Sequence, residues 1–271
     1  MALTKQPYVH GYSPRESVRL SDQAQTLSEL LHRGERFPPG ARVLEAGCGT
    51  GAQTVILARN NPATQFLSID RSAESLAHAR AAVDREGFTN VRFAQADVFK
   101  LPYPDGDFDA VFVCFLLEHV ADPPAALAEL RRVLRPGGTI TVIEGDHGSA
   151  YFHPDSALAR QAIQCLVDLQ REAHGDALIG RRLYPLLRAA GFPEVRVTPC
   201  AVYADASRPE MVEGFTRNTF TAMVAGVEDA ALASGRMDAD SWRQAIADLE
   251  RTAGPDGVFN YTFFKARAVK T

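Results

Sequence analysis

The stretch Arg42-Val-Leu-Glu-Ala-Gly-Cys-Gly-Thr-Gly51 decides the fold of this chain. Its first five residues are typical of a short buried strand, and a helical pattern follows from Gln53 to Asn60. Glycine in the turn between them allows a sharp bend and a close approach of a ligand to the backbone. The helix start beyond the turn offers unpaired N–H groups and the positive end of the helix dipole. The stretch therefore predicts a strand–turn–helix unit with a ligand at the turn; a glycine-rich turn without a ligand is the alternative.

The alternation of strand and helix continues along the chain. Strands are predicted at residues 65–70, 91–97, 108–114 and 139–144, and helices at 73–86 and 123–133. Helices of this length between strands predict right-handed βαβ units in a parallel sheet covered on both faces. The second half is less regular: strands are predicted at 194–203 and 258–265, and helices at 156–172, 181–190, 209–234 and 239–252.

Asp70 ends the second predicted strand, close to the distance at which an acidic residue binds the ribose of a nucleotide. A carboxylate can accept hydrogen bonds from both ribose hydroxyls. The alternative is a cap for the next helix, for which Ser72 is the better candidate. The dinucleotide fingerprint would need glycine at position 52, where this chain has Ala52, a residue that is sometimes allowed there.

Composition restricts the class of protein. The chain has 271 residues, 46% of them hydrophobic and 23% charged, which is ordinary for one or two globular domains. A formal net charge of -4 argues against a general nucleic-acid binder, and no apolar run reaches the roughly 18 residues of a membrane span. We expect neither nucleic acid nor a membrane as a partner. The first residues contain no apolar leader segment, and the four cysteines form no CxxC pair, so we expect a cytoplasmic protein without a disulfide framework.

Five motifs together resemble class I S-adenosylmethionine-dependent methyltransferases. In the order of that family they are Val43–Gly51, Asp70, Ala96–Val98, Phe108–His119 and Leu134–Gly138. The resemblance is close over residues 42–145. The chain has Cys114-Phe-Leu-Leu-Glu-His119 where enzymes that methylate amino groups of nucleic acids and proteins carry an Asn/Asp-Pro-Pro-Tyr signature. The resemblance therefore favours the small-molecule branch, which includes quinone and sterol methyltransferases.

The resemblance implies an α/β fold. We expect a Rossmann-like, doubly wound sheet of seven strands in the order 3-2-1-4-5-7-6, with the last strand antiparallel. Residues 1–40 would form an N-terminal helical lid, and residues 41–271 the methyltransferase domain, with a helical cap insertion at about 204–257. A homo-oligomer is possible.

The resemblance also implies a cofactor site for S-adenosylmethionine. Gly47 would contact the methionyl part, the backbone around Cys114 would accept from its amino group, and Asp97 would meet the adenine amine. Arg19 could pair with the methionyl carboxylate, although a solvated helix face is the alternative. The expected cofactor-binding residues are Tyr12, Arg19, Gly47, Gly49, Gln53, Asp70, Arg71, Asp97, Val98, Cys114 and His119.

Methyl transfer is an in-line displacement that depends mainly on positioning, and it needs a base only if the acceptor must lose a proton. The polar cluster Glu144–His153 leaves the fifth predicted strand, on the rim where acceptors bind in this architecture. Asp146 could orient His147 and so supply a base that titrates near neutral pH. A structural Asp–His hydrogen bond is the alternative, and His147 and His153 match no standard metal-ligand spacing, so no metal is expected. The expected catalytic residues are His147, Asp146 and Glu144.

Aromatic residues in and around the predicted cap suggest a mid-sized acceptor of apolar or aromatic character. Ordinary core packing is the alternative for Phe215 and Phe220, because apolar residues at helical spacing usually pack. The expected acceptor-binding residues are Tyr8, Tyr151, Tyr203, Phe215, Phe220 and Tyr261.

The sequence thus predicts methyl transfer from S-adenosylmethionine to a carbon, nitrogen or oxygen atom of a small molecule. One alternative is a nicotinamide-dependent oxidoreductase, which shares the glycine turn and the acid but would need a Tyr-xxx-Lys pair that is not recognisable here. A second alternative is a protein that binds the cofactor without catalysis, and a third is an enzyme that methylates proteins.

Overall fold

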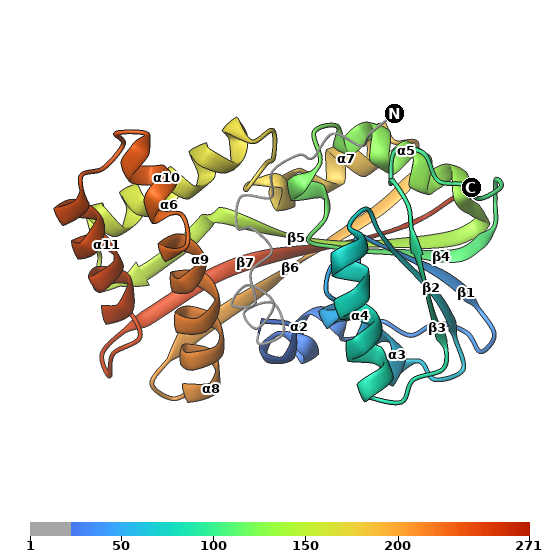
Figure 1. Cartoon of the computed structure of the whole chain (residues 1–271), viewed down its shortest axis with the longest axis horizontal. Helices are drawn as coiled ribbons and strands as arrows, with labels where there is room; N and C mark the ends of the chain where they lie inside the picture. Colours follow the sequence, from blue (N-terminus) through green and yellow to red (C-terminus); the bar gives the residue numbers. More distant parts are fainter. Residues whose placement is uncertain (1–22) are drawn as a thin grey trace. The chain divides into compact units, whose positions relative to one another are not determined.

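The computed structural model describes residues 23–271, which fold into two compact units (Figure 1). Of the described residues, unit 1 comprises 23–27, Asp146–Leu178 and Ala201–Thr262. Unit 2 comprises Ser28–Gly145, Ile179–Cys200 and Phe263–Thr271. The predicted site residues Tyr8, Tyr12 and Arg19 lie outside the described residues, as does most of the predicted lid.

Seven strands form one sheet in the order β3-β2-β1-β4-β5-β7-β6. Parallel pairing joins β1 to β2, β2 to β3, β1 to β4 and β4 to β5. The end of β7 lies antiparallel beside the start of β5, because the Gly137 amide donates to the Lys270 carbonyl and the Lys270 amide donates to Gly138. The predicted strand order and the antiparallel last strand are confirmed. The strands are β1 (Arg42–Ala46), β2 (Gln65–Asp70), β3 (Val91–Gln95), β4 (Phe108–Cys114), β5 (Leu134–His153), β6 (Glu194–Asp205) and β7 (Val258–Val269).

Short helices complete unit 2. Ser72 caps one of them, α4, by accepting from the Ser75 amide at 3.1 Å, as the sequence predicts. Asp122 caps α5 in the same way, accepting from Ala125. The helices are α2 (Ser28–His32), α3 (Ala52–Asn60), α4 (Ala73–Arg85), η1 (Leu117–His119), α5 (Pro123–Val133), η2 (Ile179–Arg182) and α7 (Leu183–Ala189).

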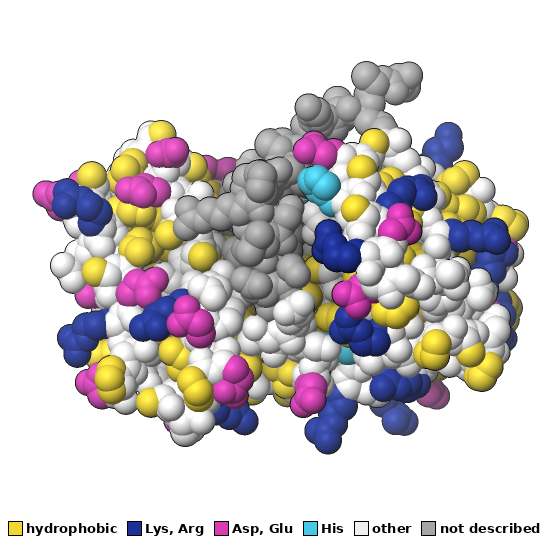
Figure 2. Space-filling model, turned by 60° about the horizontal axis from the view of Figure 1, so that its bottom comes forward, with side chains coloured by type: hydrophobic (Ala, Val, Ile, Leu, Met, Phe, Trp, Pro, Cys, Tyr) yellow, Lys and Arg dark blue, Asp and Glu magenta, His cyan; other side chains and the backbone are white. Residues whose placement is uncertain are grey.

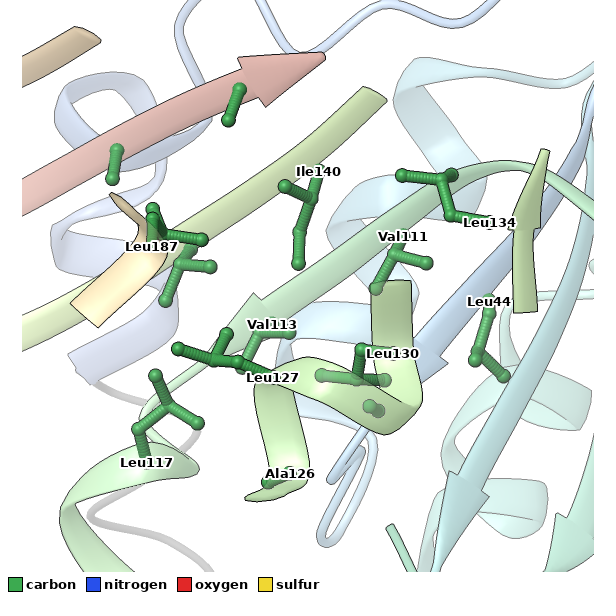
Figure 3. Packing of buried hydrophobic residues seen from close by; sticks show 14 of the residues in the cluster. Leu44, Val111, Val113, Leu117, Ala126, Leu127, Leu130, Leu134, Ile140 and Leu187 are labelled. Atoms are coloured by element: carbon green, nitrogen blue, oxygen red, sulfur yellow. The ribbon is translucent and has the colours of Figure 1, made fainter. Parts of the chain in front are cut away.

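The core of unit 2 lies between one face of the sheet and helices α5 and α7 (Figure 3). Val111 and Val113 alternate along β4 toward this face, and Leu127 and Leu130 project from α5 to meet them. All four side chains are fully buried. Burial of a side chain of this size stabilises the fold by about 1.5–3 kcal/mol, so this layer holds the sheet rigid beneath its carboxyl edge.

Strand β5 corrects the predicted boundaries. The expected strand at 139–144 in fact runs from Leu134 to His153, so the predicted rim loop is strand. Its pairing with β4 shifts between Leu134 and Thr139, and the predicted Arg135–Gly138 turn becomes a bulge inside the strand. The region past 144 stays extended because residues 140–147 are all buried and Ser149 hydrogen-bonds with Thr262 of β7.

Helices surround the strands of unit 1. The segment between β6 and β7 is helical, as predicted, but the single helix expected at 209–234 is wrong. It is interrupted at Gly226–Val227, and its middle is a π-helix in which Thr219 Oγ1 donates to the Gly214 carbonyl five residues back. Trp242 of α11 is 1% exposed, and α11 lies beside α6. The helices are α6 (Ala157–Glu172), α8 (Pro209–Met211), η3 (Val212–Thr221), α9 (Ala222–Ala225), α10 (Glu228–Ala233) and α11 (Ala239–Arg251).

The surface and the cysteines add three observations. Over residues 23–271, no helix has the length and apolar character needed to cross a membrane. Acidic and basic side chains both occur on the face shown in Figure 2. The four cysteines are buried and free of disulfides.

Candidate functional site

The glycine turn after β1 is shaped by two close contacts. A Cβ on Gly51 would lie 2.8 Å from the Ala79 Cα of α4, and a Cβ on Gly47 would lie 2.8 Å from the Leu116 side chain. Gly51 also has a φ of 86°, which disfavours other residues. A Cβ on Gly49 would meet nothing within 4 Å. The outer glycines are thus required by packing, whereas open space lies over the middle of the turn.

Asp70 joins this turn to the next helix. Its Oδ2 accepts from the Gly49 amide at 2.9 Å, and its Oδ1 accepts from the Ser72 amide at 2.8 Å. Each carboxylate oxygen has two lone pairs, so both keep capacity for a further donor. The half-buried carboxylate is therefore held in a fixed orientation at the open part of the turn.

Glu45 lies buried beneath the turn, and the sequence analysis did not single it out. Thr54 and Ser68 donate to its Oε2 at 2.7 and 2.6 Å, which ties β1 to α3 and β2. Burial raises the pKa of Glu45 to about 7, since the two hydrogen bonds only partly offset the desolvation and Asp70 adds a like charge. Its place inside the motif, between the apolar residues Leu44 and Ala46, was the available signal.

Glu144 holds the loop after β4. Its Oε1 accepts from the amides of Leu116 and Leu117 at 3.0 and 2.7 Å, while its buried Oε2 has no hydrogen-bond partner among the described residues. Burial and the nearby charge of Glu118 hold the pKa of Glu144 well above its ordinary value. Because Leu116 packs on Gly47, Glu144 supports the glycine turn from the far side of the loop. This contact describes a positioning role, and a part for Glu144 in catalysis stays a prediction.

The carboxyl ends of the first four strands bring the predicted cofactor residues to one edge. The Ala96 amide donates to the Asp70 carbonyl, which places the Asp97–Val98 segment beside Asp70. Asp97 Oδ1 itself accepts from the Phe99 amide at 3.0 Å. Cys114 is buried at the end of β4, beside β1.

Three further predicted cofactor residues lie around that edge. Gln53, in the first turn of α3, accepts from His32 at 2.5 Å. The carbonyl of Arg71 accepts from Gln95, and His119 Nε2 lies 3.5 Å from Glu118 Oε1. Among the described residues, no group of three or more His, Cys, Asp or Glu side chains could hold a metal ion.

Comparison with known proteins identifies the family. A family model described as a methyltransferase domain matches residues 44–142. The O-methyltransferase cnsE of Penicillium expansum is 34% identical over 199 residues, which cover 70% of this chain and 67% of that protein. The chain belongs to the class I S-adenosylmethionine-dependent methyltransferases. The predicted family and its cofactor are confirmed, and the nicotinamide-dependent and non-catalytic alternatives are not favoured.

Other members of the methyltransferase family match parts of the chain. The demethylmenaquinone methyltransferase of Thermus thermophilus is 41% identical over 103 residues, 38% of this chain and 46% of that enzyme. A Haemonchus contortus phosphoethanolamine N-methyltransferase 2, solved with phosphomonomethylethanolamine and S-adenosylhomocysteine, has a TM-score of 0.59. It is 16% identical, and the match covers 95% of this chain and 58% of that chain, so the likeness shows the fold alone. The chain spans 63%, 35% and 43% of the length of three other curated relatives.

In unit 1 of this methyltransferase, six rings form an aromatic cluster. His147 Nδ1 hydrogen-bonds with the Tyr261 hydroxyl at 2.8 Å, and Phe220 meets the imidazole edge-on at 6.2 Å between centroids. The sequence analysis missed two members, Phe152 and Phe259, although Phe259 lies two residues from Tyr261 and so on the same face of β7. The cluster consists of His147, Phe152, Phe215, Phe220, Phe259 and Tyr261.

Two predicted acceptor-binding residues lie away from the aromatic cluster. Tyr151 is 67% exposed, and it points to the opposite face of β5 from Phe152 because strand residues alternate. Tyr203 is 42% exposed between the buried residues Val202 and Ala204. Tyr151 and Tyr203 therefore do not belong to the aromatic cluster, and their part in binding the acceptor stays a prediction.

The predicted pairing of Asp146 with His147 is also wrong. Consecutive residues of a strand point to opposite faces, and β5 continues through both positions. Asp146 Oδ1 accepts from the Gly148 amide at 3.1 Å, and Tyr261 takes the place beside the imidazole.

Proposed function

We propose that this chain transfers the methyl group of S-adenosylmethionine to a carbon, nitrogen or oxygen atom of a small-molecule acceptor. The observation that carries the proposal is the Asp70 carboxylate, fixed by the Gly49 amide at the open part of the glycine turn. This arrangement fits a ribose beside a backbone that a ligand can approach closely. When bound, the cofactor supplies a methyl group activated on a positively charged sulfur.

Each residue at the edge of the sheet has a separate part in this proposal. Asp70 accepts from the ribose hydroxyls, Asp97 and Val98 border the adenine, and the backbone around Cys114 accepts from the methionyl amino group. Tyr12 and Arg19 keep their proposed parts at the cofactor and lie outside the described residues. The support is that the described residues of this set follow neighbouring strands at their carboxyl ends, where ligands bind in open α/β sheets.

Calorimetric titration tests the cofactor site. We expect S-adenosylmethionine and S-adenosylhomocysteine to bind with micromolar Kd and NADPH not to bind. Asp70→Ala removes hydrogen bonds to a charged group and should weaken both adenosyl ligands by about 10–100-fold. Asp84→Ala, at an exposed position of α4, is the matched control and should bind like the wild type. Binding of NADPH alone would overturn the proposal.

For the acceptor, we propose a mid-sized apolar or aromatic molecule whose proton is taken by His147. The support is an imidazole held by Tyr261 among aromatic rings, which leaves little freedom for reorientation. A base of this kind accelerates proton removal by about 10²–10⁴-fold. Asp146 and Glu144 remain candidates that would support catalysis without taking the proton themselves.

His147→Gln tests the base. With a phenolic or acidic C–H acceptor, we expect kcat to fall by about 10²–10⁴-fold and the acidic limb of the pH–rate profile to disappear. The Kd for S-adenosylhomocysteine should stay unchanged, which separates a catalytic loss from a damaged cofactor site. Tyr261→Phe keeps the ring and should lower kcat less. An unchanged kcat in His147→Gln would show that the base lies elsewhere.

A further inference from the structure

His32 ends helix α2 and lies inside unit 2, only 3% exposed. Its ring stacks on Phe112 of β4 with 5.5 Å between centroids. Its Nε2 lies 2.5 Å from Oε1 of Gln53, the second residue of α3 and two residues past Gly51. A buried imidazole thus contacts the first helical turn that follows the glycine turn.

The hydrogen bond fixes the chemical state of both side chains. The amide oxygen can only accept, so Nε2 of His32 carries the proton. In the neutral ring Nδ1 then has no proton, and within residues 23–271 this buried atom has no hydrogen-bond partner. A second proton would create a buried N–H with no acceptor, which is costly. Burial accordingly lowers the pKa of His32, the Gln53 bond and the charge of Glu35 oppose the shift, and the charge of Lys265 adds to it.

Neighbouring groups hold the imidazole in place. Lys265 of β7 donates to the carbonyls of Leu31 and Arg33, the residues on either side of His32, at 2.8 and 2.9 Å. These bonds fasten the end of α2 to the sheet while Phe112 fixes the plane of the ring. His32 therefore presents Nε2 to Gln53 in one orientation.

We infer that neutral His32 is a positioning residue for the cofactor: it holds the Gln53 amide so that Nε2 of Gln53 donates to the ligand at the glycine turn. This inference rests on the proposed function, since it requires the cofactor to bind at that turn. Among residues 23–271 no group accepts from Nε2 of Gln53, and the inference assigns a ligand at the turn as its acceptor. Protonation of His32 keeps the proton on Nε2 but adds a buried charge and an unpaired N–H at Nδ1. That cost is relieved when the ring leaves its stacked position, and the bond that orients Gln53 is then lost.

The test measures the Kd for S-adenosylhomocysteine by calorimetry between pH 5.5 and 8, with the melting temperature of each variant. His32→Phe keeps the stacked ring and removes both nitrogens; His78→Phe, at an exposed position of α4, is the matched control. At pH 8 we expect His32→Phe and Gln53→Ala each to weaken binding by about 3–10-fold, and the double variant to be no weaker than either. As pH falls, the wild type should lose affinity relative to both variants. The comparison is between variants because Glu45 also titrates near the turn.

Each outcome decides between the inference and the proposed function. If the wild type binds and His32→Phe has the same Kd and the same pH dependence, the inference is wrong and the proposed function stands. Independent, additive effects of the two substitutions also contradict it. If His32→Phe fails to fold, Gln53→Ala alone must remove the part of the pH dependence assigned to His32. If the wild type binds no adenosyl ligand, both proposals fall.

Discussion

Three carboxyl groups near the glycine turn lie in different surroundings. Asp70 is half-buried and meets two backbone amides, whereas Glu45 and Glu144 are buried in unit 2 with raised pKa values. A buried carboxyl favours its neutral form because water no longer stabilises the charge. Under the proposed function, the same functional group binds ligand at one position and supports the fold at the others.

At the residue scale we predict that Glu45 makes stability depend on pH. Its pKa is about 7 in the folded chain and 4.5 ordinarily, so its contribution is complete below pH 4.5 and is lost as pH rises through 7. Glu45→Gln keeps an oxygen for Thr54 and Ser68 but cannot ionise. The denaturant midpoint of the variant, relative to that of the wild type, should be higher at pH 8 than at pH 5. Glu74→Gln, at an exposed position of α4, is the control; a gap that stays constant with pH would contradict the prediction.

Residues whose role is local could be predicted from the sequence. The Ser72 cap depends on neighbours in the chain, and the structure confirms it. The Asp146–His147 pair was wrong because its geometry depends on whether the segment is loop or strand. Glu45 was missed because its partners come from two other elements.

At the element scale, hydrophobic periodicity placed most helices and strands within a few residues. Strand β4 and helix α5 have the predicted bounds. Strand β5 does not, because Glu144, Asp146 and His147 read as the polar end of a strand although all three are buried. When polar residues are buried and hydrogen-bonded, a pattern of apolar residues no longer predicts the whole strand.

A prediction at this scale concerns the contact between α3 and α4. Gly51→Ala forces a Cβ to within 2.8 Å of the Ala79 Cα and imposes a side chain on a φ of 86°. Overpacking and backbone strain together should lower the free energy of unfolding by about 2–5 kcal/mol. Gly87→Ala has a φ of 73° but no atom within 4 Å, so it should cost only about 1–2 kcal/mol. If a urea titration gives the same loss of unfolding free energy for both variants, the contact with Ala79 does not contribute to stability.

At the scale of the whole molecule, the sheet order could not be predicted from periodicity, because local patterns do not specify which distant strands pair. It came from the resemblance to the methyltransferase family. Contacts across long sequence distances were equally hidden: Lys265 of β7 donates to Glu35 at 3.2 Å, and Thr141 of β5 donates to the same carboxylate at 3.1 Å. These bonds join the segment before β1 to strands β5 and β7.

Replacement of the buried Lys265 should lower the stability of the fold. Among the described residues, Lys265→Met leaves Glu35, which is 2% exposed, with Arg267 as its remaining cation. We expect the free energy of unfolding to fall by about 3 kcal/mol. The double variant Lys265→Met/Glu35→Gln removes the uncompensated charge and should recover part of the stability. Lys100→Met, at an exposed position, serves as control. Chemical denaturation compares these variants and Glu35→Gln alone with the wild type, and a double variant that loses more stability than the two single variants together would contradict this account.

The buried Trp242 has a practical consequence, because it is the one tryptophan in the chain. Its fluorescence reports on the surroundings of α11 in unit 1, whereas circular dichroism averages over the helices and strands of both units. Denaturation curves from the two signals coincide if the units melt together and separate if they melt apart. A single chromophore therefore converts a routine melting curve into a measurement of how independently the two halves of this methyltransferase fold.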